Sequence, residues 1–355
     1  MTKRFTRRRF LRLSGAALVA TFLPAPGSDR PFRPRAAGPV RMGRAIHGVT
    51  IYDAPRADGE RVGAFHTEDT FPIIQEVNAP GLNAHNDLWY ETTDGYVFSA
   101  WVQPLWVWPP QFTHTDLGEW GFWGEVCVPY TDARSNPHPD AASPYRFYNG
   151  TVYHVVDVAF DGLGNGWYKV YDELPPPTHQ WVLASDIRRI SREELTPIRP
   201  FAGTKRIEVD LSQCQITCFE GSRIVFTTPC APGLGERELE DGTIEDLGSP
   251  KGEHCVLLKQ PSRHMSNLPQ DEDDPQPTDP FDLPGVPWDT FFDRSGAAIH
   301  GTYWHNDFGV PRSHGCLNVS NDAARWIYRW THPISGAEDD YVQSDCRVGT
   351  PIIVF

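Results

Sequence analysis

The sequence predicts a mainly β protein of two or three domains. The chain has 355 residues, which is more than a single hydrophobic core usually serves. Proline (33), glycine (30) and tryptophan (12) are abundant, and the segments between turn-forming residues are short and aromatic. Closely spaced turns with aromatic strands between them are typical of barrels and sandwiches.

The first 44 residues read as a leader and linker. Arg7-Arg8-Arg9-Phe10-Leu11 has the twin-arginine form, and an apolar stretch follows from Leu13 to Leu23. That stretch is too short for a stable membrane anchor. Signals of this form export folded proteins, so we expect the mature protein outside the cytoplasmic membrane. A basic tail without a targeting role is the alternative.

Charge separates this leader from the rest of the chain. Residues 1–44 hold eleven of the 32 Lys and Arg residues and one of the 46 acids, which leaves 21 basic and 45 acidic residues. The remaining chain therefore has a net charge of −24 with histidine neutral. So acidic a body repels nucleic acid and anionic lipid. We expect no nucleic-acid partner and no membrane span in the mature protein.

A weak internal repeat divides residues 45–196 into two modules, 45–115 and 116–196. Each copy has a Trp-Tyr pair followed by a Trp-Val pair. The pairs are Trp89-Tyr90 and Trp101-Val102 in the first module, and Trp167-Tyr168 and Trp181-Val182 in the second. Each copy has the size of a small barrel, and its alternating residues suit half-buried strands. Both copies resemble bacterial SH3-like modules, which implies a role in binding wall peptides or in spacing.

A third domain is expected over residues 204–355. Pro197 and Pro200 break regular structure just before it, and residues 205–211 read as its first strand. One short helix is expected near its end, because Ser320 can cap the segment that continues through residues 322–328.

The most informative feature is Ser313-His314-Gly315-Cys316-Leu317-Asn318, with Ile299-His300-Gly301 upstream. Only the thiolate of a cysteine is a strong nucleophile, and a neighbouring imidazole can take its proton. Gly315 leaves space in front of Cys316, and the backbone N–H groups of both residues could stabilise an oxyanion. The pattern predicts acyl transfer through a thioester.

These two segments closely resemble the catalytic motif of bacterial L,D-transpeptidases, the cysteine enzymes that cross-link peptidoglycan. The resemblance spans residues 204–355 and implies a β-sandwich-like catalytic domain. It implies that Cys316 is the acylated nucleophile and His300 the general base. Gly301 would orient the imidazole through its backbone carbonyl, and His314 and Gly315 occupy further motif positions.

The resemblance also implies a substrate-binding surface. A lid is expected over the acidic, proline-rich residues 269–287, with aromatic side chains that reach the substrate. The expected substrate-binding residues are Trp288, Tyr303, Trp304, Ser313 and Asn318.

The activity that follows is L,D-transpeptidation of peptidoglycan stem peptides, in the cell wall, the periplasm or at the outer face of the cytoplasmic membrane. The same residues with water as acceptor would give an L,D-carboxypeptidase. An alternative of another class is a wall-binding or wall-anchoring protein that acts through the SH3-like modules. No cofactor is expected.

Two further readings concern the cysteines and histidines. Zinc ligands could come from His300, His305, His314 and Cys316, but the spacing matches no common structural zinc pattern, so we expect no metal. Seven cysteines leave at least one thiol free. The other six are expected to be buried or to include a disulfide. The helix after Cys316 should lower the thiol pKa modestly through its dipole.

Overall fold

The computed structural model describes residues 38–355 apart from 175–176, 240 and 270–275. The twin-arginine segment therefore lies outside the described residues. Pro39–Phe355 form one compact unit. In the described part of the chain, no helix combines the length and apolar character that crossing a bilayer requires.

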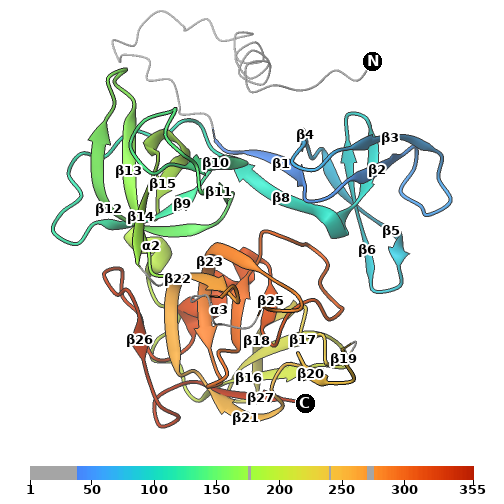
Figure 1. Cartoon of the computed structure of the whole chain (residues 1–355). Coiled ribbons are helices and arrows are strands. Elements are labelled where there is room, and N and C mark those ends of the chain that lie inside the picture. The colour runs from blue at the N-terminus through green and yellow to red at the C-terminus, as the bar shows by residue number, and fades with distance from the viewer. Residues whose placement is uncertain (1–37, 175–176, 240, 270–275) are drawn as a thin grey trace, which may run out of the picture. The chain divides into compact units, whose positions relative to one another are not determined.

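The first module forms two antiparallel sheets (Figure 1), with orders β4-β1-β8 and β3-β2-β7-β6-β5. Its elements are β1 (Val40–Ala45), β2 (Val49–Tyr52), β3 (Arg61–Phe65), β4 (Thr70–Pro72), β5 (Gln75–Asn83), β6 (Asn86–Thr92), β7 (Gly95–Phe98), the 3-10 helix η1 (Ser99–Trp101) and β8 (Val102–Val107). Strand β1 pairs with β8 from Val40↔Val107 to Ala45↔Val102. Residues 40–44 are therefore a strand of this module, and the expectation that they are linker is wrong.

The second module repeats this plan, with sheets β14-β13-β12-β9-β15 and β10-β11. Its elements are β9 (Phe122–Val126), β10 (Tyr130–Ala133), β11 (Tyr145–Tyr148), β12 (Val152–Phe160), β13 (Gly166–Asp172), β14 (Thr178–Leu183), the 3-10 helix η2 (Ala184–Asp186), β15 (Ile187–Arg189) and α2 (Arg192–Leu195). Strand pairings among the described residues close neither module into a barrel. The SH3-like assignment stays a prediction.

The Trp-Tyr pairs occupy equivalent places in the two modules, but the Trp-Val pairs do not. Tyr90 on β6 pairs with Val97, and Tyr168 on β13 pairs with Val182. The counterpart of Val182 is therefore Val97, whereas Val102 begins the strand after η1. The two Trp-Val pairs have similar spacing in the sequence but occupy different strands of their modules, so the sequence repeat paired the wrong residues.

The third domain is a β-sandwich of two five-stranded sheets, with orders β18-β17-β16-β27-β21 and β25-β24-β23-β22-β26. Its elements are β16 (Lys205–Asp210), β17 (Gln215–Glu220), β18 (Arg223–Pro229), β19 (Glu236–Glu238), β20 (Ile244–Asp246), β21 (Gly252–Cys255), β22 (Leu258–Ser266), β23 (Asp282–Phe291), β24 (Ala298–Gly301), β25 (Leu317–Val319), α3 (Asn321–Trp330), β26 (Val342–Gln343) and β27 (Pro351–Val354). Both sheets and α3 contribute to one apolar core, which includes Ile207, Val209, Ile299, Leu317, Ile327 and Val354. Burial of these side chains is what holds the layers together.

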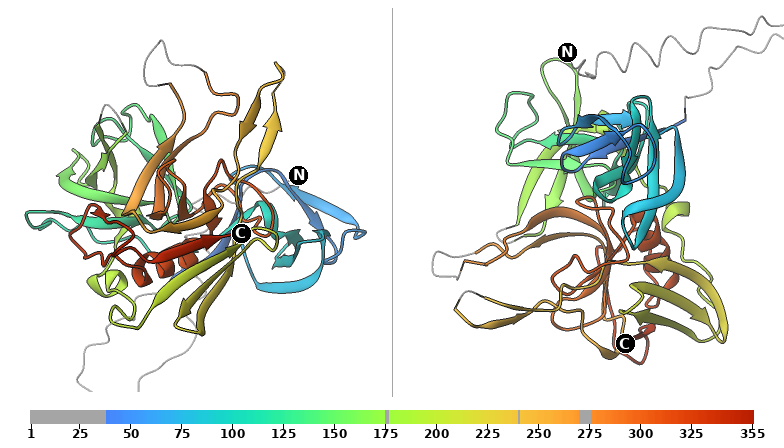
Figure 2. Two further views of the ribbon diagram at one scale, coloured as in Figure 1. Left: turned by 90° about the horizontal axis from the view of Figure 1, so that it is seen from below. Right: turned by 90° about the vertical axis from the view of Figure 1, so that its right-hand side faces the viewer.

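Two hairpins project from the same side of this sandwich (Figure 2): β19–β20 and β22–β23. Arg237 on the first hairpin donates to Thr278 Oγ1 on the second (2.6 Å) and pairs with Asp279 (3.5 Å). The expected lid, residues 269–287, falls in this second hairpin, but its residues 282–287 belong to strand β23 of the sheet and are not a lid. Residues 270–275 lie outside the described residues.

The helix expected after the motif is confirmed. Ser320 caps α3 by accepting from Ala323 N, and Asp322 lies in the first turn. A second helix, α2, was not expected. It has four residues and a capping box between Ser191 and Glu194. The Ser-x-x-Glu spacing was the available signal.

One disulfide joins Cys255 to Cys346, with the two Cα atoms 5.3 Å apart. Cys127, Cys214, Cys218 and Cys230 are free and buried, and Cys316 is free and partly exposed.

Candidate active site

Strands β24 and β25 bring the two halves of the motif together. They are parallel, with Ile299 opposite Leu317 and His300 opposite Asn318. Because side chains alternate along a strand, Ile299 and Leu317 point into the core, while His300 and Asn318 point to the other face. Cys316 comes directly before Leu317, and a backbone hydrogen bond from Ala298 on β24 reaches its thiol. The thiol therefore lies beside β24, two residues before the imidazole along that strand.

The turn before Cys316 requires glycine and is held by two serine hydroxyls. Gly315 has φ +113°, a conformation that other residues rarely adopt. Ser313 Oγ donates to the carbonyl oxygen of Cys316 (2.5 Å), and Ser249 Oγ donates to the same oxygen (3.2 Å). Ser313 is buried. It holds the turn, and its place does not suit the substrate contact expected of it.

His300 is held in a tautomer that can act as a base. Its Nδ1 donates to the carbonyl oxygen of Gly301 (2.9 Å), as expected for this pair. Nε2 then carries the lone pair. His300 is 2% exposed, and burial lowers its pKa to about 4 against the opposing effect of the Gly301 contact. The ring is therefore neutral at pH 7 and able to accept a proton.

Burial raises the pKa of the Cys316 thiol to about 11, although a backbone hydrogen bond from Ala298 opposes the rise. Loss of solvent is the largest cause, so the net thiol pKa lies above its usual range. The modest lowering expected from the helix dipole stays a prediction. The resting pair is a neutral thiol and a neutral imidazole. Such a pair calls for proton transfer during attack rather than a stored thiolate.

His305 is bound to the motif and does more than pack in its loop. Its Nε2 lies 3.0 Å from the amide Nδ2 of Asn318, and its Nδ1 accepts from the backbone N–H of Asp307 (3.2 Å). Burial lowers its pKa to about 4, so the ring is neutral and has one donor. That donor must be Nε2. Asn318 Oδ1 is buried without a partner, so we assign this oxygen to the position that faces Nε2.

His314 lies at the mouth of the site beside the lid hairpin. Its Nε2 lies 3.1 Å from Asp279, and its ring contacts Phe281 with centroids 5.3 Å apart. Both partners belong to the segment between β22 and β23. The expected lid therefore borders the motif through this histidine.

The three aromatic residues expected to bind substrate differ in accessibility. Trp288 is 2% exposed and packs on Tyr328 in the core, so substrate cannot reach its ring. Tyr303 is buried, donates to Pro284 O (3.1 Å) and stacks on Tyr148. Trp304 is partly exposed, with its ring 5.9 Å from that of His300. Only Trp304 keeps a place suited to the expected role, and Asn318 is buried against His305.

One carboxyl near the site was not anticipated. Asp289 is 0% exposed, and neither of its oxygens has a partner among the described residues. It precedes Thr290, whose partner Ile299 precedes His300. Burial raises the pKa of Asp289 well above its usual range, which favours the protonated form of this carboxyl. An aspartate between Trp288 and Thr290 in an apolar strand was the signal in the sequence.

His300, His305, His314 and Cys316 were also the candidate zinc ligands. Across residues 38–355, excluding the undescribed gaps, no three His, Cys, Asp or Glu side chains are grouped to hold a metal ion.

Residues 204–354 match the YkuD family model, which describes the L,D-transpeptidase catalytic domain. This part of the chain is therefore an L,D-transpeptidase catalytic domain. A search of curated proteins found no match to the chain.

Solved L,D-transpeptidase structures are similar to parts of the chain. One from Xylanimonas cellulosilytica (residues 123–326) is 24% identical over 45% of this chain and 63% of that chain, with a TM-score of 0.30. One from Mycobacterium smegmatis is 16% identical over 72% and 90%, with a TM-score of 0.31. L,D-transpeptidase 3 from Mycobacterium tuberculosis, in complex with a faropenem-derived adduct, is 20% identical over 52% and 76%, with a TM-score of 0.28. The chain thus spans less than two thirds of the first of these structures.

Proposed function

We propose that this protein is an exported cysteine L,D-transpeptidase that cross-links peptidoglycan stem peptides. The observation that carries the proposal is that paired strands β24 and β25 bring His300 next to the segment that follows Cys316, with the Cys316 thiol beside Ala298 on β24, inside the matched catalytic domain. The tautomer of His300 leaves Nε2 free to take the thiol proton.

Acylation begins when Cys316 Sγ attacks the carbonyl carbon that joins the L-centre of a diamino acid to a terminal D-residue. The thiol proton passes to Nε2 of His300 as the C–S bond forms. The N–H groups of Gly315 and Cys316 stabilise the oxyanion. The C–N bond then breaks, and the amine of the D-residue leaves with the proton from His300.

Transfer reverses the sequence with a new amine. A side-chain amine of a second stem peptide attacks the thioester and gives a proton to His300. The C–S bond breaks, and Cys316 recovers a proton. Water in place of the amine would make the enzyme an L,D-carboxypeptidase. Because the resting groups are neutral, one histidine can serve both half-reactions.

The N-terminal part of the chain supports action outside the cytoplasm. The twin-arginine segment within residues 1–44 favours export to the cell wall, the periplasm or the outer face of the cytoplasmic membrane. The two modules would bind wall peptides or space the catalytic domain from the wall. The complete Cys316/His300 pair counts against a protein that only binds or anchors.

The decisive experiment incubates the purified full chain with muropeptides and reads the products by mass spectrometry. Cross-linked dimers are expected. Shortened monomers without dimers would mean a carboxypeptidase. Unchanged muropeptides, together with pelleting on insoluble peptidoglycan, would mean a binding protein.

A further inference from the structure

The loop that joins the two halves of the motif is bound to the first module. We call residues 302–312 the motif loop. Within it, Asn306 N donates to Ala100 O (3.0 Å), and Asn306 Nδ2 donates to Tyr90 Oη (3.0 Å) and Ser99 O (3.3 Å). Burial raises the pKa of Tyr90 to about 12, so its hydroxyl stays protonated. One asparagine thus makes three hydrogen bonds to β6 and η1.

A buried carboxylate makes the second attachment. Asp307 lies 2.8 Å from Nε2 of His85 in the first module and accepts from Arg312 Nε in its own loop (3.0 Å). Burial opposes its charge, but these contacts lower the pKa of Asp307 below its usual range. A buried charge is costly unless it is paired. The loop therefore depends on the module for one of the hydrogen-bond partners of this buried carboxylate.

A buried arginine makes the third attachment. Arg44 on β1 donates from Nη2 to Tyr303 O (2.7 Å) and from Nε to Gln103 Oε1 (2.9 Å). Its guanidinium lies 4.1 Å from the ring centroid of Tyr148, a residue of the second module that stacks on Tyr303. Arg44 thus joins the motif loop to both modules.

The motif loop in turn holds the residue beside the catalytic base. His305 lies between Tyr303 and Asn306, the residues that the first module binds. Thr302 Oγ1 donates to the carbonyl oxygen of His305 (2.9 Å). The ring of His305 binds Asn318, the register partner of His300. The contacts therefore run from Tyr90 in the first module, through the loop, to the strand that follows Cys316.

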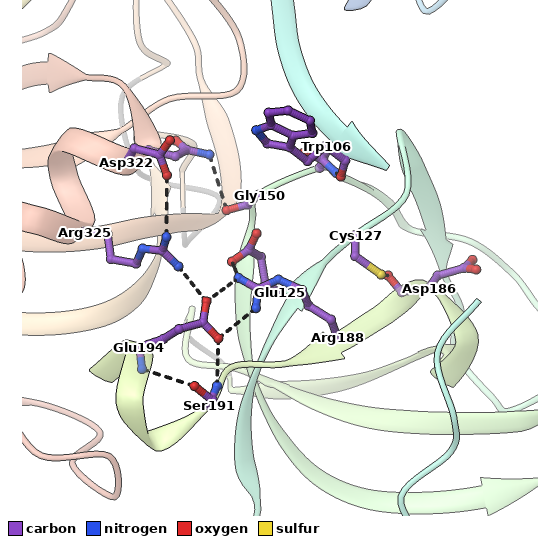
Figure 3. A network of polar contacts seen from close by, with 12 residues as sticks. Trp106, Glu125, Cys127, Gly150, Asp186, Arg188, Ser191, Glu194, Asp322 and Arg325 are labelled. Carbon is purple, nitrogen blue, oxygen red and sulfur yellow. Dashed lines mark hydrogen bonds and ion pairs between the residues drawn. The ribbon is translucent and has the colours of Figure 1, made fainter. Parts of the chain in front are cut away.

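The helix after the motif is bound in the same way by the second module (Figure 3). Arg325 on α3 donates to Glu194 Oε1 (2.9 Å), and Glu194 also accepts from Arg188, which pairs with Glu125 on β9. Asn321, at the start of α3, lies within hydrogen-bonding distance of Gly150 O (3.5 Å). Both flanks of the motif are thus held by residues outside the catalytic domain.

We propose that the two modules are a positioning frame for the active site, and that Asn306 is the positioning residue through which the first module acts. The module fixes Asn306 and Asp307, these fix His305, and His305 sets Asn318 beside His300. This inference rests on the proposed function for its effect on rate, and it adds a role beyond wall binding or spacing. A positioning role differs from a purely structural one in its expected effect: the acylation rate falls while the thermal stability of the folded protein stays unchanged.

The test uses the full chain, three single variants and the double variant Asn306→Ala/Tyr90→Phe. Asn306→Ala removes the two hydrogen bonds that the Asn306 side chain donates to Tyr90 and Ser99. Tyr90→Phe removes only the hydroxyl that accepts one of them. Tyr96→Phe on β7 removes a hydroxyl elsewhere in the same module and is the matched control. Acylation of Cys316 by a carbapenem is followed by intact mass at several concentrations. This separates the maximal rate from the half-saturating concentration. Thermal unfolding is recorded in parallel.

Asn306→Ala should lower the maximal acylation rate roughly tenfold to a hundredfold, because small misplacements of catalytic groups carry costs of that size. Tyr90→Phe should act in the same direction with a smaller effect, and Tyr96→Phe should match wild type. The double variant should be less impaired than the product of the single effects, because both changes remove the same bond. Unchanged maximal rates in Asn306→Ala and Tyr90→Phe would overturn the inference.

Hydrogen–deuterium exchange gives a readout that needs no activity. Peptides covering residues 302–319 should exchange faster in Asn306→Ala and Tyr90→Phe than in wild type or Tyr96→Phe. Equal exchange in these peptides would overturn the frame even if wild type is an active transpeptidase. Faster exchange in these two variants, combined with a wild type that no carbapenem acylates, would keep the frame and count against the proposed function.

Discussion

Nδ1 of His300 lies 2.9 Å from the carbonyl oxygen of Gly301, which makes Nε2 the basic nitrogen of the site. The neutral ring and the neutral thiol of Cys316 together give the site a distinct pH dependence.

The acylation rate should be level through neutral pH and fall only as the pH approaches the His300 pKa of about 4. Protonation of His300 removes the acceptor of the thiol proton, and the thiol itself ionises only near pH 11. Rate constants for carbapenem acylation from about pH 4 to about pH 9 check this. An acidic limb centred near the ordinary histidine pKa would contradict the neutral pair.

Cys316→Ser should lose turnover while it keeps the fold. An alcohol is much harder to ionise than a thiol, and His300 is too weak a base to compensate. Muropeptide conversion and circular dichroism measure the two properties. Wild-type activity should survive EDTA and be lost with iodoacetamide. A folded serine variant with near wild-type activity would exclude Cys316 as the nucleophile.

His300→Ala should slow acylation far more than His305→Ala. Loss of a general base costs ~10²–10⁴-fold in rate. His305 acts only through Asn318, so its loss should cost less. Intact-mass kinetics with a carbapenem give both values. Equal losses would require a new assignment of the base, and if His314→Ala were the only inactive variant, His314 would be the base.

Asp289→Asn should gain stability relative to wild type as the pH rises. The folded state keeps the Asp289 proton, because burial raises its pKa, whereas the unfolded state releases it above its ordinary value of about 3.9. The contribution of Asp289 to the free energy of unfolding of the wild type therefore decreases as the pH rises, whereas the amide variant has no titrating group at this position. Urea unfolding at about pH 5 and about pH 8 measures the difference. Asp58→Asn, at an exposed carboxyl, is the control and should show no such trend.

A fragment of residues 39–196 should unfold cooperatively and be more stable than a fragment of residues 45–196. The longer fragment keeps β1, which pairs with both β4 and β8. Thermal unfolding compares the two fragments. Pelleting of the longer one with insoluble peptidoglycan would favour wall binding, and its recovery in the supernatant would favour spacing. Failure of both fragments to fold would contradict the modular division.

The sequence was enough to find Cys316 and His300 because each lies in a short motif whose spacing reflects two neighbouring parallel strands. It could not find Asp289 or the bond from His305 to Asn318. Those relationships depend on which strands pair and in which register, and that is decided by contacts between distant segments. Burial was equally hidden. Trp288 was expected to contact the substrate, but its ring packs on Tyr328 in the core. Its backbone has φ +65°, which the sequence did not indicate.

Composition and turn residues were enough to predict the fold class. They could not predict the contacts between the modules and the catalytic domain. The Trp-Tyr pairs marked equivalent strands in the two modules because large aromatic residues are needed at the same buried positions. The contact of Arg44 with Tyr303 joins residues 259 positions apart, and no local pattern reports such a bond.

For the export proposed above, the raised pKa of Cys316 has a consequence for how long its thiol survives. Peroxide and disulfide exchange attack thiolates, and a thiol that ionises only near pH 11 is almost fully protonated at neutral pH. In the oxidising surroundings where a bond such as Cys255–Cys346 persists, an ordinary exposed cysteine is lost to oxidation. The raised pKa would thus protect Cys316, although the residue is partly exposed, because only a small fraction of its thiol is in the form that oxidants attack.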